Sequence, residues 1–538
     1  MSIFNLTLSV VLTMFSSVVL SYISMATMIG PWIAPTLVLI AGLALRLKKK
    51  SISSQKQNQE IALIQTVGSI GGIIATAVGF TLPTLYFLDK PAFEQLLENP
   101  ATFCILIGAI VLGSGSLGIL LGRAFGRKLL VKENLPFPIG HLIHKTITSQ
   151  SQTSQAKRML TGFSITGLFC ALRDSLSLPS LIPAGFPITL MPMLWAIGFI
   201  AGTAIAYPLL VGMISKYLVL YPINNHASYL PIKLFPVLDK ALFSMAFCSG
   251  LILAQVLPGL LRYPSIIWGS IKQYSGYTYL HRFRSGKSFI RKLMAGAPKL
   301  LTNLEAIFAL AITAALFTYL KFPLSIIFVM IPLTVVSAYH ISYIAGKIGL
   351  AQIGRFTTFV MIPIMLLFKL TPLQITVLCV FVSSCITVST DLLIDYKVGE
   401  LCNINLERIR RYQWLGLIVT AACLGYFLWI LLTNLQVGST ELFAQRGKAR
   451  ALLIQSFNFN WVVVSLGFLY GLILKKLKIN PTMVFGGILM PNGLTIGLVF
   501  GATLSLFVKN KENYMPFCSG IFASESLWMI IRIAAGII

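Results

Sequence analysis

The chain contains 538 residues, of which 56% are hydrophobic and only 11% are charged. Soluble domains carry about 25% charged residues, so this composition excludes an ordinary soluble enzyme, a coiled coil and a disordered protein. The 42 Lys and Arg outnumber the 15 Asp and Glu and give a net charge of +27. Apolar stretches of about twenty residues recur along the whole chain, whereas the alternating segments of a membrane barrel are absent. The sequence therefore predicts an all-α, polytopic bundle in a membrane.

Taken in chain order, the apolar stretches predict about sixteen transmembrane segments, several of them broken by Gly or Pro. The longest polar stretch has too few apolar positions for a core of its own. We therefore expect residues 1–538 to form a single transmembrane domain. The predicted spans are 6–26, a second that ends before Arg46, 61–88, 101–121, 159–172, 189–206, 208–221, 241–261, 304–320, 323–344, 356–370, 373–393, 414–435, 459–474, 484–508 and 515–533.

The distribution of Lys and Arg predicts the orientation of the chain. With the N-terminus in the cytoplasm, 30 of the 42 basic residues fall in segments on the cytoplasmic side, as the positive-inside rule requires. Both termini are therefore expected to be cytoplasmic. A basic cytoplasmic loop, 273–300, is expected to connect an N-terminal half, 1–272, to a C-terminal half, 301–538.

Ionisable side chains deep in apolar spans are costly to bury and are candidates for function. Glu525 lies about ten residues into the last span, near the middle of the bilayer; a purely structural hydrogen bond to another helix is the alternative. His340 is a candidate proton relay or a cap for polar backbone. Asp391 and Asp395 are four residues apart and share one helix face, and Lys397 follows. A preference of charges for the end of a span explains these three residues almost as well.

Gly and Pro interrupt several apolar segments. Gly71 and Gly72 precede Pro83 in one predicted span, and Pro136 and Pro138 follow another. Such breaks expose backbone groups, which are tolerated where they face protein or a water-filled cavity, and secondary transporters build substrate sites from them. The alternative is that membrane helices simply tolerate Gly and Pro. Further interruptions lie at Gly30-Pro31 and at Gly486-Gly487 with Pro491.

Several absences narrow the choice of function. The eight Cys form no CxxC pair and the five His are scattered, so neither a metal site nor a disulfide framework is expected. No GxxxxGK[ST], HExxH or GxSxG motif occurs, which excludes a P-loop ATPase and disfavours a membrane enzyme. No basic face with interleaved aromatic residues indicates nucleic-acid binding. A secondary transporter without metal or cofactor is the best interpretation, with an intramembrane transferase and a non-transporting receptor or scaffold as alternatives.

Five segments in order along the chain resemble the oligopeptide transporter family, which includes the yellow-stripe-like metal-chelate carriers. QTVGSIGGIIATAVGFTLPTLYFL (65–88) is similar to a family span, and LPFPIG (135–140) is similar to the family's LpfPeG segment. The paired spans of 189–222, the segment 391–416 and SGIFASESL (519–527) resemble further family landmarks. By motif position, the resemblance covers essentially the whole chain and carries over Tyr22, Gln65, Thr66, Pro83, Pro136, Pro138, Gly140, Asp395, Lys397, Gly399 and Glu525.

The resemblance implies import of small oligopeptides or metal chelates, coupled to protons, across a bacterial-type inner membrane. The implied partners are the substrate, protons and membrane lipids, and a homodimer stays open. Glu525 and His340 are the expected proton-coupling residues. Asp391, Asp395 and Lys397 are expected to form an inner gate, with an ion pair between the last two. The expected substrate pathway comprises Tyr22, Gln65, Thr66, Gly71, Gly72, Pro83, Pro136, Pro138 and Gly140.

The chain departs from the family pattern at several positions. Ile139 and Lys145 stand where the family carries acids, and Ser524 replaces a glycine before the retained Glu525. The family's Asn-Pro pair falls at Ile353-Gly354 and is lost. A cation in place of an acid attracts carboxylates if it faces the pathway, so we expect an anionic substrate. The alternative is that Ile139 and Lys145 lie on a solvated helix that never meets substrate.

Overall fold

The computed structural model describes residues 3–27, 33–47, 54–149, 152–175, 190–222, 243–258, 261, 264–265, 304–323, 325–348, 353–456 and 459–535. These residues form helices and connecting turns without a β-strand, and the predicted helical membrane bundle is confirmed. Six helical segments among them are long and apolar enough to cross a bilayer, and a bent helix pair raises the number to seven. The predicted number of sixteen spans is not confirmed. The six segments are Ile3–Ala26 (α1), Ser54–Leu88 (α3 with α4), Pro100–Lys132 (α6 with a π-helical turn), Ser325–Lys347 (within α15), Pro372–Leu401 (α17) and Leu406–Asn434 (α18).

Shorter helices complete the bundle, and local sequence explains where many of them begin. Asn460 and Asn480 accept hydrogen bonds from the first turns of the helices that follow them, which satisfies backbone N–H groups that have no partner in the helix. Pro occupies the first turn of several others, where its missing N–H costs nothing. Besides α15, whose full range is Ser325–Ile348, these helices are α2 (Ala34–Leu47), α5 (Lys90–Glu98), α7 (Pro138–Thr148), α8 (Gln152–Ser175), α9 (Pro192–Ala201), α10 (Thr203–Ser215), the unlabelled helix Phe243–Pro258, α14 (Leu304–Tyr319), α16 (Ile353–Leu367), α19 (Gln445–Gln455), α20 (Trp461–Lys476), α21 (Pro481–Leu489), α22 (Asn492–Leu504) and α23 (Met515–Ala534).

The third predicted span is interrupted, but only at its end. Helix α3 (Ser54–Gly79) stops at Gly79, and α4 (Thr84–Leu88) begins directly after Pro83. Gly71 and Gly72 lie inside the continuous α3. A Cβ at Gly71 would come within 2.9 Å of the Thr13 carbonyl oxygen on α1. This pair therefore permits close helix approach and does not break the helix.

Two other predicted spans differ in the structure. The stretches 189–206 and 208–221 were each expected to cross the membrane, but α9 and α10 form one pair bent by 115°. The bend lies at Gly202, whose φ of 68° is readily available only to glycine. Conversely, the expected single span 484–508 is divided into α21 and α22 next to Pro491. Pro cannot donate the hydrogen bond that would continue α21.

Helix α17 lies at the centre of the molecule. An apolar stretch of 18 consecutive residues in this helix is entirely buried, and the helix packs against α3, α6, α15 and α18. Glycines on α6 allow this close packing, because a Cβ at Gly118 would lie 2.7 Å from the Cys385 carbonyl oxygen on α17. We call α1, α3, α6, α17 and α18 the central bundle.

Eight further helices, four from each half, pair with one another in reverse chain order. Helix α8 packs on α23, α9 on α22 and α10 on α21, and glycine contacts join Phe243–Pro258 to α20. At each crossing, one glycine of each helix faces a backbone carbonyl of the other, so a Cβ at either position would collide with backbone. The reverse order is typical of inverted repeats. The reciprocal glycines are Gly162 and Gly520, Gly198 and Gly501, Gly212 and Gly487, and Gly250 and Gly467.

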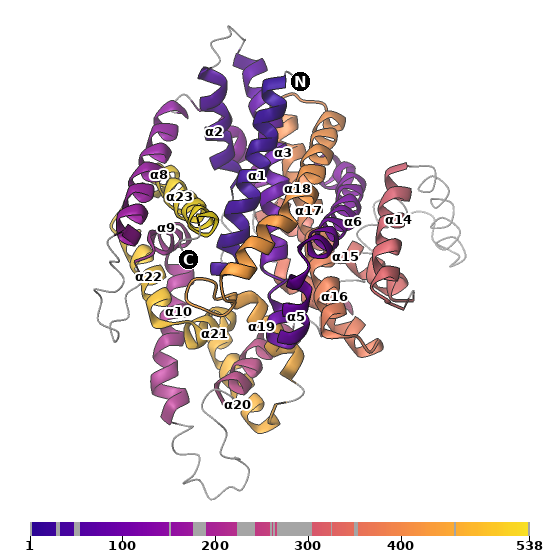
Figure 1. The fold of residues 1–538 in the computed structure, drawn as a ribbon, viewed down its shortest axis with the longest axis vertical. Coiled ribbons are helices and arrows are strands. Elements are labelled where there is room, and N and C mark those ends of the chain that lie inside the picture. Colours follow the sequence, from indigo (N-terminus) through magenta and orange to yellow (C-terminus); the bar gives the residue numbers. More distant parts are fainter. Residues whose placement is uncertain are drawn as a thin grey trace, which may run out of the picture.

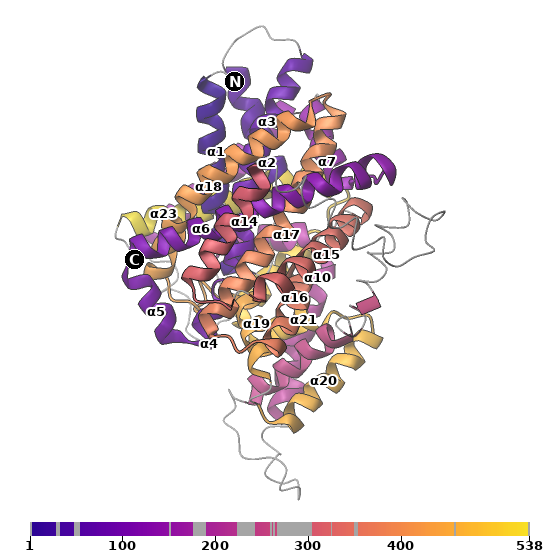
Figure 2. The same ribbon diagram turned by 90° about the vertical axis from the view of Figure 1, so that its right-hand side faces the viewer.

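We call this second group of helices (α8–α10, Phe243–Pro258 and α20–α23) the paired bundle. Figure 1 shows its labelled helices α8–α10 and α21–α23 on one side of the molecule, with α1, α3, α17 and α18 beside them. The view turned by 90° places α20 and α21 at the end opposite the N-terminus (Figure 2). Contacts of α1 and α18 with α23, and of α2 with α8, join the two bundles. Helix α19 follows α18 of the central bundle and precedes α20 of the paired bundle, so it lies in the part of the chain that connects the two bundles.

Candidate functional site

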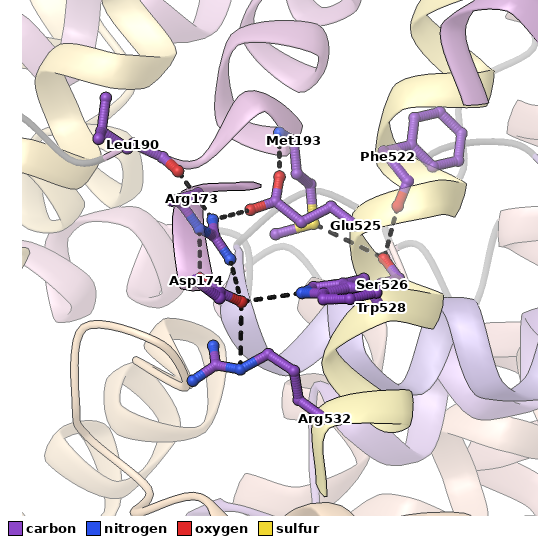
Figure 3. Close-up of polar contacts among 9 residues, drawn as sticks. All are labelled: Arg173, Asp174, Leu190, Met193, Phe522, Glu525, Ser526, Trp528 and Arg532. Atoms are coloured by element: carbon purple, nitrogen blue, oxygen red, sulfur yellow. Dashed lines mark hydrogen bonds and ion pairs between the residues drawn. The ribbon is translucent and has the colours of Figure 1, made fainter. Parts of the chain in front are cut away.

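Glu525 on α23 is fully buried and holds two elements together (Figure 3). Its Oε1 accepts a hydrogen bond of 3.1 Å from Arg173 Nη1 at the end of α8. Its Oε2 accepts one of 2.6 Å from the backbone N–H of Met193 in the first turn of α9. A carboxylate at a helix N-terminus is favourably placed, because the N–H groups there are otherwise unsatisfied. Glu525 therefore fixes α9 and α8 against α23.

Further charges extend this ion pair into a network. Asp174 accepts hydrogen bonds from Arg173 Nε at 2.8 Å and from the indole N–H of Trp528 at 2.8 Å. Arg532 Nε lies 3.2 Å from the same carboxylate. We call Glu525, Arg173, Asp174 and Arg532 the Glu525 cluster. It contains two carboxylates and two guanidinium groups, and its charge is balanced.

Asp391 and Asp395 form a second buried acidic centre, on α17. Asp391 is 3% exposed and Asp395 is 1% exposed. Gln413 Nε2 on α18 donates to both carboxylates, at 3.2 Å to Asp391 and 2.8 Å to Asp395. On α3, Ser69 Oγ donates to Asp391 at 3.2 Å and Gln65 Nε2 to Asp395 at 3.3 Å. We call these five residues the aspartate cluster. It joins three helices of the central bundle.

The aspartate cluster differs from the Glu525 cluster in charge. Within the described part of the chain, neither Asp391 nor Asp395 makes an ion pair. Their carboxylates accept side-chain hydrogen bonds only from neutral amide and hydroxyl groups there. The amide oxygens of Gln65 and Gln413 are buried and have no hydrogen-bond partner there either. Two adjacent carboxylates in a medium of low dielectric constant repel each other strongly. Such a site favours the binding of a proton or another small cation.

The predicted ion pair between Asp395 and Lys397 is not formed, which corrects that expectation. Lys397 Nζ instead lies 3.1 Å from Glu400 Oε2. Residues two apart on a helix point to different faces, whereas residues three apart are neighbours. Gly140 on α7 faces the aliphatic part of the Lys397 side chain. A Cβ at Gly140 would lie 3.1 Å from the Cβ of Lys397. Lys397 therefore belongs to the contact between α7 and α17.

The predicted pathway residues fall into separate regions. Tyr22 is fully buried on α1, its hydroxyl has no hydrogen-bond partner among the described residues, and Glu525 is within electrostatic range. Gln65 belongs to the aspartate cluster, and Thr66 is buried beside it on α3. Pro136 and Pro138 are exposed and flank Phe137, whose N–H donates to the Gly346 carbonyl. They shape the start of α7 and do not line the buried clusters.

His340 does not approach either acidic centre. It is partly buried on α15, and its ring lies 5.3 Å from the ring of Phe356 on α16. The described residues give it no carboxylate within ion-pair distance. Lys145, at one of the departures from the family pattern, is 78% exposed in its side chain and faces Glu512 at 3.9 Å. Lys145 is therefore on a solvated surface, as in the alternative interpretation of this position.

Some residues of the site escaped the sequence reasoning. Arg173 and Asp174 directly follow the short predicted span 159–172, and their charges are the available signal. Gln413 and Ser69 are uncharged, and nothing in their local sequence separates them from other polar residues in membrane helices. No group of three or more His, Cys, Asp or Glu that could hold a metal ion occurs among the described residues.

The fold and the two buried charge clusters define a polytopic helical membrane protein with a polar interior, the class to which secondary transporters belong. The sequence profile described as OPT oligopeptide transporter protein matches residues 2–535. The chain therefore belongs to the oligopeptide transporter family, and it is a transporter and not an enzyme. A search of curated proteins finds no match.

Proposed function

We propose that the protein is a secondary active importer of small oligopeptides or metal chelates, driven by protons in symport. The aspartate cluster is the observation that carries this proposal. The two buried carboxylates have no counter-cation in the described structure. The pair with one bound proton or other cation is therefore more stable than the pair with both carboxylates ionised and no cation bound. Binding neutralises the repulsion between Asp391 and Asp395 and changes the interactions that join α17 to α3 and α18.

Glu525 is a second proton-responsive group in this proposal, as the sequence led us to expect. Protonation of Glu525 would weaken its ion pair with Arg173 and release α8 and α9 from α23. The paired bundle would then rock against the central bundle in alternating access, with α19 at the boundary. Among the described residues, His340 has no acidic neighbour to exchange protons with, and it is the weaker candidate. Asp391, Asp395 and Lys397 remain the proposed inner gate, although Lys397 acts through Glu400.

The proposed location is a bacterial-type inner membrane, with both termini and the loop 273–300 in the cytoplasm. That loop lies outside the described residues. An apolar groove of about 430 Å³ between α6 and α14, lined by residues such as Ile105 and Leu316, offers a surface for lipid chains.

The test is uptake into proteoliposomes that contain only this protein. Labelled trialanine and a labelled ferric polycarboxylate chelate are offered with an inward proton gradient, with and without a protonophore. We expect accumulation above the external concentration that collapses when the protonophore is added. A receptor or scaffold with the transporter fold would give no uptake of either compound above that of empty liposomes.

A further inference from the structure

Helix α19 places three cations, Arg446, Lys448 and Arg450, at the boundary between the two bundles. It contacts α1 and α4 of the N-terminal part, and its first residue follows Ala444, whose N–H donates to the Met25 carbonyl of α1 at 2.7 Å. A Cβ at Gly447 would lie 3.0 Å from the backbone N of Thr84, directly after the break between α3 and α4. Figure 1 shows α19 near the middle of the molecule.

The two arginines share one face of α19 because they are four residues apart. The Arg446 guanidinium lies 4.0 Å above the ring of Phe80, in the turn that follows α3. Arg450 Nη1 lies 3.5 Å from the carbonyl oxygen of the same Phe80. The Arg446 guanidinium also faces Gly354 at the start of α16, at 3.6 Å from a built Cβ. Two positive charges therefore converge on the interrupted end of α3.

Arg450 is 7% exposed, and its Nε is buried without a hydrogen-bond partner in the described structure. Neither Arg450 nor Lys448 makes an ion pair with a described carboxylate; Lys448 lies over the rings of Phe87 and Phe443, at 5.8 and 5.4 Å. Like charges four apart on a helix repel each other, and a buried charge without a partner is costly. The buried amide oxygen of Gln445 also lacks a described partner.

We propose that Arg450 and Arg446 bind the carboxylate of the transported substrate, which makes an anionic peptide or polycarboxylate chelate the preferred class. This inference rests on the proposed uptake function. A guanidinium group binds a carboxylate through two parallel hydrogen bonds, and the Arg450 Nε without a partner is one of the donors this geometry uses. Helix α19 touches α1 of the central bundle and α4, and it directly precedes α20 of the paired bundle in the chain.

The experiment measures binding and does not depend on transport. Protein purified in detergent is titrated with four probes: the peptides Glu-Ala-Glu and trialanine, trialanine amide, and citrate. Binding to the folded state raises the unfolding temperature. We expect Glu-Ala-Glu and citrate to stabilise the wild-type protein most, and trialanine amide least.

Variants then locate the site. Arg450→Gln should weaken the binding of Glu-Ala-Glu about ten- to hundredfold, as expected for the loss of a charged hydrogen-bond partner. The ligand-free variant should be no less stable than the wild type, because a buried charge without a partner has been removed. Arg410→Gln is the matched control: Arg410 is already ion-paired with Glu305 and Glu407, so this variant should keep the full response to the probes.

Three outcomes would overturn the assignment. The first is a wild-type protein that none of the four probes stabilises. The second is Arg450→Gln with an unchanged response. The third is a ligand-free Arg450→Gln variant that unfolds at a lower temperature than the ligand-free wild type, which would mark a structural role for Arg450. Arg450→Lys keeps the charge, so its response to the probes shows whether carboxylate binding depends on the guanidinium group. Absence of uptake in proteoliposomes with intact binding would refute the transport proposal and leave the site.

Discussion

Glu525 and the Asp391–Asp395 pair are equally buried, yet one is surrounded by cations and the other is not. Glu525 meets Arg173 at 3.1 Å, and the neighbouring Asp174 and Arg532 complete a balanced network. Among the described residues, the side chains of Asp391 and Asp395 receive hydrogen bonds only from neutral groups. Removing a carboxylate has opposite consequences at the two places. At Glu525 it leaves a buried cation without a partner, whereas at the aspartate pair it relieves repulsion.

The difference separates a carboxylate that holds helices together while it is ionised from a pair of carboxylates that binds a mobile charge. A balanced ion pair is satisfied without a ligand, so it stabilises one conformation. An uncompensated pair of acids is satisfied only when a cation arrives, so its conformation depends on that cation. We therefore expect coupling to depend most strongly on the aspartate cluster and stability to depend most strongly on the Glu525 cluster.

The largest effect is expected for Asp395→Asn, which removes one charge from the uncompensated pair with little change in shape. Accumulation driven by a proton gradient should fall to simple equilibration across the membrane, while exchange of internal for external substrate persists. Stability should be unchanged or higher, because the repulsion with Asp391 is lost. Proteoliposome uptake and counterflow, with unfolding temperature as control, test this. Full accumulation by the variant would remove the aspartate pair from the coupling mechanism.

Glu525→Gln should show the reverse pattern in stability. The variant leaves Arg173 buried beside a neutral amide, and loss of one partner from a buried ion pair costs about 3–5 kcal/mol. The free energy of unfolding should recover in part in the double variant Glu525→Gln with Arg173→Gln, because no buried charge is left unpaired. Denaturation of the purified variants measures this, and proton-driven accumulation is measured in parallel. Equal stability of wild type and Glu525→Gln would contradict the balanced network.

How far the sequence predicted these clusters depends on whether the partners are near in the chain. The burial of Glu525 and the shared face of Asp391 and Asp395 follow from apolar context and helical spacing. Arg173 lies 352 residues from Glu525, and no local pattern connects the two. The same applies to Gln413 and Ser69, which are neutral and become informative only when three helices meet.

Other differences have local causes that the sequence contained. Lys397 pairs with Glu400, three residues away, as helix geometry favours over the two-residue spacing to Asp395. The spacing of Arg446 and Arg450 also placed two cations on one face. By contrast, the reciprocal glycines of the paired bundle could not be paired from the sequence, because the crossings join segments more than 200 residues apart.

A medium effect is expected from the helix crossing that brings Arg173 to Glu525. On α8, Gly162 faces the Phe517 carbonyl of α23, and an added methyl would collide with backbone that cannot turn aside. Gly162→Ala should destabilise the protein by about 1–3 kcal/mol. Gly167→Ala, on the same helix, is the control: its Cβ would meet only the rotatable hydroxyl of Ser524, at 3.2 Å. Equal unfolding temperatures for the two variants would contradict the close backbone contact between α8 and α23 at Gly162.

The smallest effect is expected at Lys397, the third residue of the proposed inner gate. Its partner Glu400 has a side chain that is 55% exposed, and ion pairs with one such exposed member contribute about 0–1 kcal/mol. Lys397→Met keeps the stem that packs against Gly140 and removes only the charge. Accumulation should stay within about fivefold of wild type, since 1 kcal/mol corresponds to about fivefold. If Lys397→Met instead abolished accumulation as Asp395→Asn is expected to, Lys397 would have to reach Asp395 in another conformation, and the aspartate pair would no longer be uncompensated throughout the transport cycle.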